Sequence, residues 1–235
     1  MIFDILKDGL EYVGTNKNQT ILYYMGILLF PLVLIESYSY HIIENCLDGI
    51  INNKDRLPDI TLNPKNIING LKLLILKLLY YLPEIIILII SFNLKHVDYY
   101  ILFPVMIILT LLSYYISQMA GVVMVETGQF KEGFNFKKIF EILKSVGITY
   151  VEFIIATFII ILGIMGVTMM LAGFIMFLGN FSSILITIFL FLILILFFIF
   201  IVVMIPSYVL FKNRAVVSIY NLKWPKWIKQ DYIYS

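Results

Sequence analysis

Long runs of hydrophobic residues alternate with short polar segments along this chain. Crossing the hydrocarbon core of a bilayer, about 30 Å thick, takes about 20 helical residues. Five runs reach that length: residues 21–40, 67–92, 99–125, 148–178 and 183–211. They lack the alternation of membrane β-strands, so each predicts a helix that satisfies its own backbone hydrogen bonds in lipid. The pattern therefore predicts an all-α integral membrane protein with about five transmembrane helices, in one domain over residues 1–235.

Three segments beside these runs or at their starts place apolar and charged positions at helical spacing. They are the N-terminal segment within residues 1–19 and two lysine-bearing segments, residues 64–78 and 134–147. Amphipathic helices of this kind lie in the interface between lipid and water. We therefore expect interfacial helices beside the transmembrane ones.

Composition supports a membrane protein. Hydrophobic residues make up 61% of the chain, charged residues make up 14%, and the mean hydropathy is +0.97. A soluble domain carries about 25% charged residues, so soluble catalysis, nucleic-acid binding and intrinsic disorder are all disfavoured. One cysteine and two histidines exclude an intrachain disulfide and a multi-cysteine metal centre. We expect no metal ion and no cofactor.

The basic residues are distributed unevenly with respect to the five runs. Five crossings place the N-terminus and the C-terminal tail on opposite sides of the membrane. Fourteen of the seventeen Lys and Arg residues then fall on the side of the tail, and three fall on the other side: Lys7, Lys17 and Lys95. Because basic residues favour the cytoplasmic side, we expect a multi-pass protein of the cell membrane with its N-terminus outside and its C-terminus in the cytoplasm.

The expected cytoplasmic tail, residues 212–235, combines basic residues with Trp and Tyr rings. Basic side chains attract anionic lipid headgroups, and these aromatic rings prefer the membrane interface. The tail therefore predicts anchoring to membrane lipids and not nucleic-acid binding.

A short pattern near the start of each lysine-bearing helix occurs twice. Asn63-Pro64 begins the first copy and Asn135-Phe136 begins the second, 72 residues later. Two copies with the same orientation would form a parallel internal repeat, as in some transporters. Coincidence between two lysine-rich helix starts is the alternative.

One face of the predicted second span carries polar side chains at helical spacing: Lys77, Tyr80, Tyr81 and Glu84. An intramembrane charge is costly and tends to persist where it has a partner or a function. Pro83 also removes a backbone hydrogen bond beside Glu84. This stripe is the candidate intramembrane site, with Gln118 of the third span as a partner for Glu84. In the alternative interpretation, Lys77 reaches the headgroups and Glu84 is protonated or bonded to a neighbouring helix.

The predicted fourth span contains three glycines, Gly163, Gly166 and Gly173. Small residues let membrane helices approach closely, so this face predicts packing against another helix. The run over residues 148–178 is long for one span and short for two. One bent helix and a more complex arrangement both remain open.

Several short motifs occur in a distinctive order: Leu6-Lys7-Asp8-Gly9-Leu10, Leu57-Pro58-Asp59, Asn69-Gly70-Leu71-Lys72, Tyr80-Tyr81-Leu82-Pro83 and Gly128-Gln129-Phe130. In this order the chain resembles the uncharacterised archaeal membrane proteins of domain-of-unknown-function family 4013. The resemblance implies a multi-span α-helical fold in an archaeal cell membrane. It implies no activity.

Two functional classes are favoured over an enzyme. The repeat and the Pro83-Glu84 break favour a permease or transporter component, whereas the lack of a dense polar site favours a structural or assembly-forming membrane protein. The chain has no Ser/His/Asp or Cys/His grouping and no phosphate-binding glycine loop, so we expect no enzymatic activity. Membrane lipids are the expected partners, together with a second copy of the chain or a cytoplasmic protein.

Overall fold

The computed structural model describes residues 1–47, 49, 51, 55–61, 63–93, 99–179 and 183–223, and this part of the chain is helical, with no strand. The α-helices are α1 (Ile2–Val13), α2 (Lys17–Leu29), α3 (Pro31–Cys46), α4 (Pro64–Tyr80), α5 (Leu82–Asn93), α6 (Tyr99–Thr127), α7 (Phe136–Gly179), α8 (Ser183–Ile199) and α9 (Ile205–Asn221). A 3₁₀-helix, η1 (Phe130–Phe134), precedes α7, and a π-helix, η2 (Phe200–Met204), joins α8 to α9.

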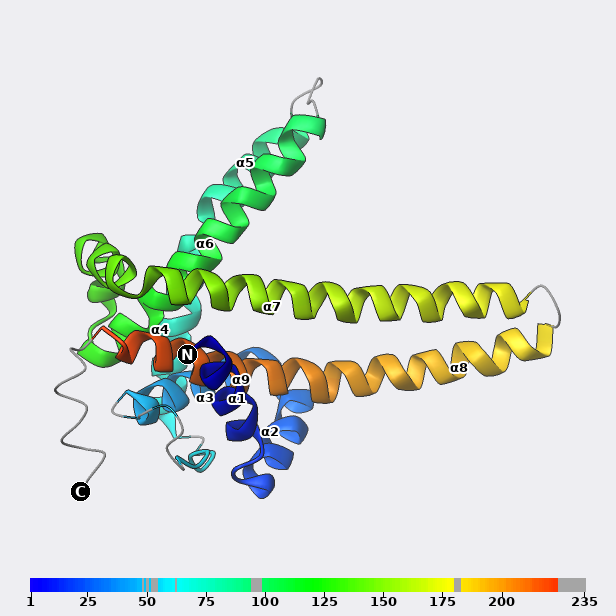
Figure 1. Ribbon diagram of the computed structural model, residues 1–235, viewed down its shortest axis with the longest axis horizontal. Helices are drawn as coiled ribbons and strands as arrows, with labels where there is room; N and C mark the ends of the chain where they lie inside the picture. Colours follow the sequence, from blue (N-terminus) through cyan, green and yellow to red (C-terminus); the bar gives the residue numbers. More distant parts are fainter. Residues whose placement is uncertain are drawn as a thin grey trace.

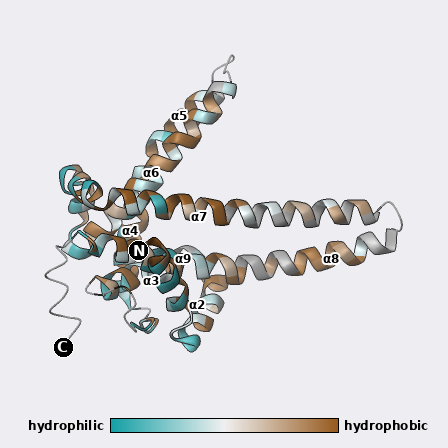
Figure 2. Ribbon diagram, in the orientation of Figure 1, coloured by the Kyte–Doolittle hydropathy of each residue, from teal (hydrophilic) through white to brown (hydrophobic). Residues whose placement is uncertain are grey.

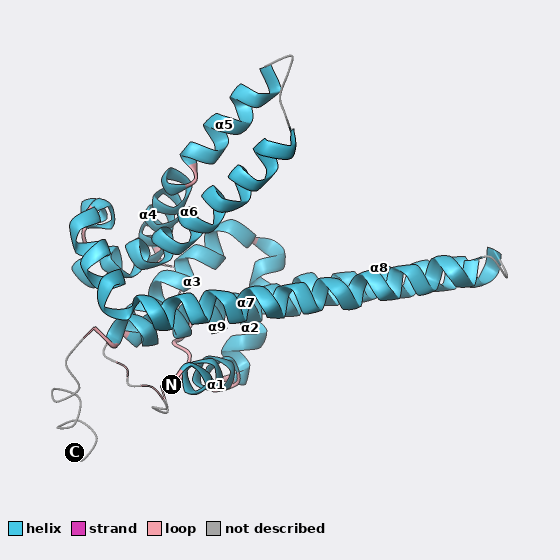
Figure 3. Cartoon of the chain, turned by 45° about the horizontal axis from the view of Figure 1, so that its top comes forward, coloured by secondary structure: helices cyan, strands magenta, loops and turns pink. Residues whose placement is uncertain are grey.

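The helices form a compact body from which two long arms project (Figure 1). The first arm consists of α5 and the part of α6 beside it. The second arm consists of the C-terminal part of α7 together with α8. The turned view also shows both arms leaving the body (Figure 3). The body contains α1, α2, α3, α4 and α9, with the remaining parts of α6 and α7.

Side chains from six helices fill the core of the body without any exposed surface: Ile5, Ile42, Leu73, Met119, Ile139 and Val217. Burying one such side chain contributes about 1.5–3 kcal/mol. The arms have no comparable core, since large apolar side chains on both are exposed, among them Ile89, Phe103, Met170 and Phe191. Figure 2 shows hydrophobic residues along both arms and most of the hydrophilic ones in the body.

Three helical stretches in the described chain are long and apolar enough to cross a membrane: Leu102–Thr127, Phe136–Ile160 and Val202–Asn221. A fourth candidate is the pair Pro64–Tyr80 and Leu82–Ser91, which is bent by 48°. The expected all-α fold with apolar helices is thereby confirmed.

The predicted first span, residues 21–40, is not one helix. It is divided at Phe30, whose extended backbone (φ −139°, ψ 66°) separates α2 from α3. Pro31 explains the break, because a residue before proline avoids helical geometry. The rings of Tyr23 and Tyr38 lie 4.8 Å apart, although 15 residues of straight helix would separate them by about 22 Å. The two helices therefore fold back on each other.

The predicted fourth span is part of a much longer helix. Residues 136–147, expected at the interface, continue without a break into residues 148–179, so that α7 has 44 residues. At 1.5 Å per residue this helix is about 66 Å long. The open question about residues 148–178 is resolved in favour of one helix.

The first ten residues of the expected tail, residues 212–221, belong to helix α9 inside the body. Helix α9 continues to Asn221, and every side chain from Leu210 to Asn221 is buried. The first ten residues of the expected lipid-anchored tail are therefore covered by protein, because α1 and α3 pack on this part of α9. Residues 224–235 lie outside the described chain.

The N-terminal segment forms the expected amphipathic helix, α1, but its inner face packs on protein. Ile5 and Tyr12 are buried there. Gly9 permits the close approach of α9, because a Cβ atom at this position would lie 2.9 Å from the Phe211 ring. Phe3 and Leu10 on the outer face remain exposed.

Candidate functional site

The bend between α4 and α5 buries a carboxyl group. Helix α4 ends at Tyr80, and Pro83 stands at the second position of α5. Glu84 follows directly and is only 5% exposed. Neither of its carboxyl oxygens has a hydrogen-bond partner in the described part of the chain. A buried polar group without a hydrogen-bond partner is costly, so this position favours a partner that binds the carboxyl group.

Hydroxyl groups surround the base of the first arm next to Glu84. Tyr81 interacts with the carboxyl group of Glu84 and with the hydroxyl of Ser117 on α6. Ser117 donates a hydrogen bond to the carbonyl of Tyr114 over 3.2 Å. The Tyr114 hydroxyl lies 3.0 Å from that of Tyr208 on α9. A line of polar groups therefore leads from Glu84 into the body.

The polar stripe predicted on the second span is divided by the bend. Lys77 donates a hydrogen bond to Glu36 of α3 over 2.5 Å in an ion pair. Tyr80 instead donates to the carbonyl of Gly133 in η1 over 2.7 Å. Only Tyr81 and Glu84 remain together at the candidate site. Nothing local in the sequence pointed to the pair of Lys77 with Glu36, because the two residues are 41 positions apart.

Gln118 is buried on α6 but forms no hydrogen bond with Glu84. The expected network, in which Gln118 or a tyrosine hydroxyl bonds the Glu84 carboxyl group, is therefore absent from the described residues. Of the two neighbouring α6 residues, Ser117 is the one that interacts with Tyr81.

The glycine face of α7 meets no other helix in the described part of the chain. A Cβ atom added at Gly163, Gly166 or Gly173 would have no neighbouring atom within 4 Å in the described structure. The expected packing is therefore not made in the described part of the chain, because this stretch of α7 has left the body. Close packing instead occurs at Gly70, where an added Cβ would collide with the backbone of Ser37.

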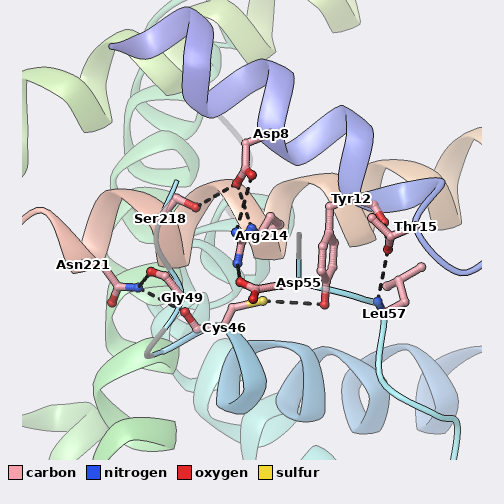
Figure 4. Close-up of polar contacts among 10 residues, drawn as sticks. All are labelled: Asp8, Tyr12, Thr15, Cys46, Gly49, Asp55, Leu57, Arg214, Ser218 and Asn221. Carbon is pink, nitrogen blue, oxygen red and sulfur yellow. Dashed lines mark hydrogen bonds and ion pairs between the residues drawn. The ribbon is translucent and has the colours of Figure 1, made fainter. Parts of the chain in front are cut away.

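A second polar centre lies inside the body around Arg214 (Figure 4). Arg214 is 1% exposed, and its Nε donates to Asp8 Oδ2 of α1 over 2.8 Å. Its Nη1 donates to Asp55 Oδ2 over 2.9 Å. The guanidinium carbon also lies 5.3 Å from the centre of the Tyr12 ring. Two carboxylates and an aromatic face thus stabilise the buried cation.

Neighbouring contacts attach the end of α3 to this centre (Figure 4). Asn221 Nδ2 donates to the carbonyls of Cys46 and Gly49, over 3.1 and 2.9 Å. The Cys46 thiol donates to the Tyr12 hydroxyl over 3.6 Å. Burial raises the pKa of both Cys46 and Tyr12, so both groups are neutral at physiological pH. The centre is therefore structural and lacks a reactive thiolate.

A third centre fixes the end of α6. Glu126 accepts hydrogen bonds from Lys138 over 3.0 Å, from Tyr220 over 2.6 Å and from Lys223 over 2.6 Å. One carboxylate therefore connects α6, the start of α7 and the end of α9. In the described chain no three His, Cys, Asp or Glu side chains form a group that could hold a metal ion.

These features define an all-α protein with apolar helices compatible with membrane insertion and a buried carboxyl group beside a broken helix. The family model described as "Protein of unknown function (DUF4013)" matches residues 21–173, which is more than half of the chain. The chain belongs to this family. No curated protein and no solved structure matches it.

Proposed function

We propose that this protein is a multi-span protein of the cell membrane and a component of a transport system, in which Glu84 takes up and releases a proton. The observation that carries the proposal is the burial of Glu84 without a hydrogen-bond partner in the described chain, directly after the 48° bend. The proposal assigns no catalytic reaction to the chain.

Broken helices favour ion and solute sites inside membranes. At such breaks, carbonyl groups lose their intrahelical partners and can bind a ligand. Pro83 has no N–H group, so it donates nothing to the carbonyl of Leu79, four residues earlier, which accepts from the N–H of Tyr81 at the end of α4. The carboxyl group of Glu84 and this carbonyl both belong to the bend. Ionisable residues inside membrane segments mark proton relays and substrate paths in pumps and transporters.

A carbodiimide tests the protonation state of Glu84, because such reagents modify protonated carboxyl groups in apolar surroundings. We expect labelling of the purified protein at Glu84 and loss of the label in Glu84→Gln. Glu152→Gln, which alters an exposed glutamate of α7, is the matched control and should label like the wild type.

Proton movement is then measured in proteoliposomes that contain a pH-sensitive dye, under an imposed membrane potential. The wild type and Glu152→Gln should acidify the lumen faster than Glu84→Gln. Equal rates in all three proteins, or a label at another carboxyl group, would contradict the proposal.

The exposed arms favour a second candidate function. Large apolar side chains of the second arm, among them Met170 and Phe191, are exposed, and the glycines of α7 face open space in the described structure. This geometry suits an assembly-forming membrane protein whose arms pack against a second copy of the chain. Native mass spectrometry in mild detergent distinguishes the two candidate functions, because an assembly-forming protein should be an oligomer that Gly166→Leu disrupts.

A further inference from the structure

The two ends of the predicted first span lie together. Gln19 precedes that span and Asp59 follows it, yet Gln19 Nε2 donates to Asp59 Oδ1 over 2.8 Å. The backbone N–H of Ile60 donates to Gln19 Oε1 over 3.0 Å. Two groups in direct contact lie on the same side of a membrane. Residues 21–40 therefore enter and return.

The fold-back between α2 and α3 has the form of a re-entrant hairpin. Tyr38 of α3 donates to the carbonyl of Pro58 over 2.8 Å, beside the start of α2. At the opposite end, the tip is apolar, and Leu29 and Phe30 are 73% and 61% exposed. Such a tip can enter the apolar region from one side without crossing it.

Helix α1 is attached to α9, so these two helices also share a side. The ion pair of Asp8 with Arg214 is buried, and Phe211 packs against Gly9. Asp55 bonds the same guanidinium group. Helix α1, the segment over residues 55–61 and α9 therefore form one unit.

We infer that the chain docks on one face of a lipid bilayer, with the body on the cytoplasmic side and both arms inserted from it as hairpins. Helices α4 and α5 lead outward and α6 returns; α7 leads outward and α8 returns. The inference rests on the membrane insertion included in the proposed function, but not on proton transport.

The lengths of the helices fit this arrangement. Helix α5 alone is too short to cross, but exposed Leu71, Ile75 and Leu78 continue its apolar surface along α4. From residue 71 to residue 93 the bent pair is about 34 Å long. A hydrocarbon core is about 30 Å thick. The longer second arm spans the same thickness when tilted.

The distribution of basic residues supports a cytoplasmic body more strongly with two inserted hairpins than it supports a cytoplasmic tail with five crossings. The chain has seventeen Lys and Arg residues, and the segments between the arm helices, residues 94–98 and 180–182, contain only Lys95. The remaining sixteen, 17 minus 1, fall in segments that this topology assigns to the cytoplasmic side or to the cytoplasmic ends of the arms. With five crossings, fourteen basic residues would lie on the cytoplasmic side and three on the other. The positive-inside rule therefore places the body in the cytoplasm.

Single cysteines in a Cys46→Ser background test the inference. Lys17→Cys reports on the start of α2, Lys131→Cys on η1, and Asn93→Cys on the tip of the first arm. Lys17 and Lys131 are exposed. An impermeant maleimide is applied to intact cells and, in parallel, to permeabilised cells, where all three variants should react.

In intact cells we expect Asn93→Cys to react and both lysine variants to be protected at least tenfold. Five crossings predict instead that Lys17→Cys reacts together with Asn93→Cys. Reaction of Lys17→Cys in intact cells, or protection of Asn93→Cys, overturns the inference. The same labelling pattern is expected in Glu84→Gln. Failure of the transport proposal would therefore leave this pattern unchanged, and the two proposals can be rejected separately.

Discussion

At the scale of single residues, Arg214 determines how three segments of the body meet. Its guanidinium group bonds Asp8 and Asp55 at the same time, with almost no exposure to solvent. Removing one member of such a pair leaves a charge buried without compensation, which is far more costly than losing a surface ion pair.

Arg214→Met is expected to lower the free energy of unfolding by about 3–5 kcal/mol, because two carboxylates lose their cation. Asp8→Asn should cost less, since Asp55 still pairs with Arg214. Thermal unfolding in mild detergent measures both. Lys7→Gln, which removes an exposed ion pair with Glu11, is the control and should change stability by less than about 1 kcal/mol. Equal effects of Arg214→Met and Lys7→Gln would contradict the buried pairing.

Cys46 offers a second test at this scale. Burial raises the pKa of its thiol, so the reactive thiolate is scarce at pH 8. A membrane-permeant maleimide should therefore leave the native protein unlabelled at pH 8 and should label it after denaturation in SDS. Lys131→Cys provides an exposed thiol for comparison. Rapid labelling of native Cys46 would show that the α1–α3 contact is open.

At the scale of elements, the closest helix contact lies between α3 and α4. Gly70 makes it possible, because a Cβ atom there would collide with the backbone of Ser37. Backbone atoms cannot rotate away as a side chain can, so even a methyl group must force the two helices apart.

Gly70→Ala is expected to destabilise the protein by about 1–3 kcal/mol through overpacking. Gly163→Ala is the matched control, because its added methyl group meets no atom of the described chain. The better helix propensity of alanine should leave the control neutral or slightly stabilised. Unfolding midpoints in detergent measure both variants, and a neutral Gly70→Ala would mean that α3 and α4 lie further apart.

Helix boundaries set by local chemistry were predictable from the sequence, and contacts between distant helices were not. Asn63 caps α4 with its side chain, as the Asn63-Pro64 pair indicates, and Pro83 stands beside the predicted break. The break at Pro31 was missed, because uninterrupted hydrophobicity on both sides of this proline resembles one span. The pairing of Asp8 with Arg214 has no local pattern. Its only signal is an arginine within a largely apolar helix, which requires a partner.

At the scale of the whole molecule, the buried contacts that stabilise the fold lie in the body, whereas the apolar arms are exposed. The body is held by a packed core and by buried ion pairs, whereas the described arms contribute few contacts to it. Composition and the lengths of the hydrophobic runs predicted the apolar helices. They did not predict the return of residues 21–40, because the number of crossings depends on which helices fold back.

The contact between α1 and α9 also determines the order in which the body is completed. Asp8 and Arg214 are 206 positions apart in the chain, so the whole segment between them, with both arms, is synthesised before the pair can form. Until then α1 lacks the helix against which Gly9 packs. Contacts this distant in sequence form slowly, and the apolar face of α1 that is exposed until they form is prone to aggregate. The contact between α1 and α9 therefore forms only after both arms have been made.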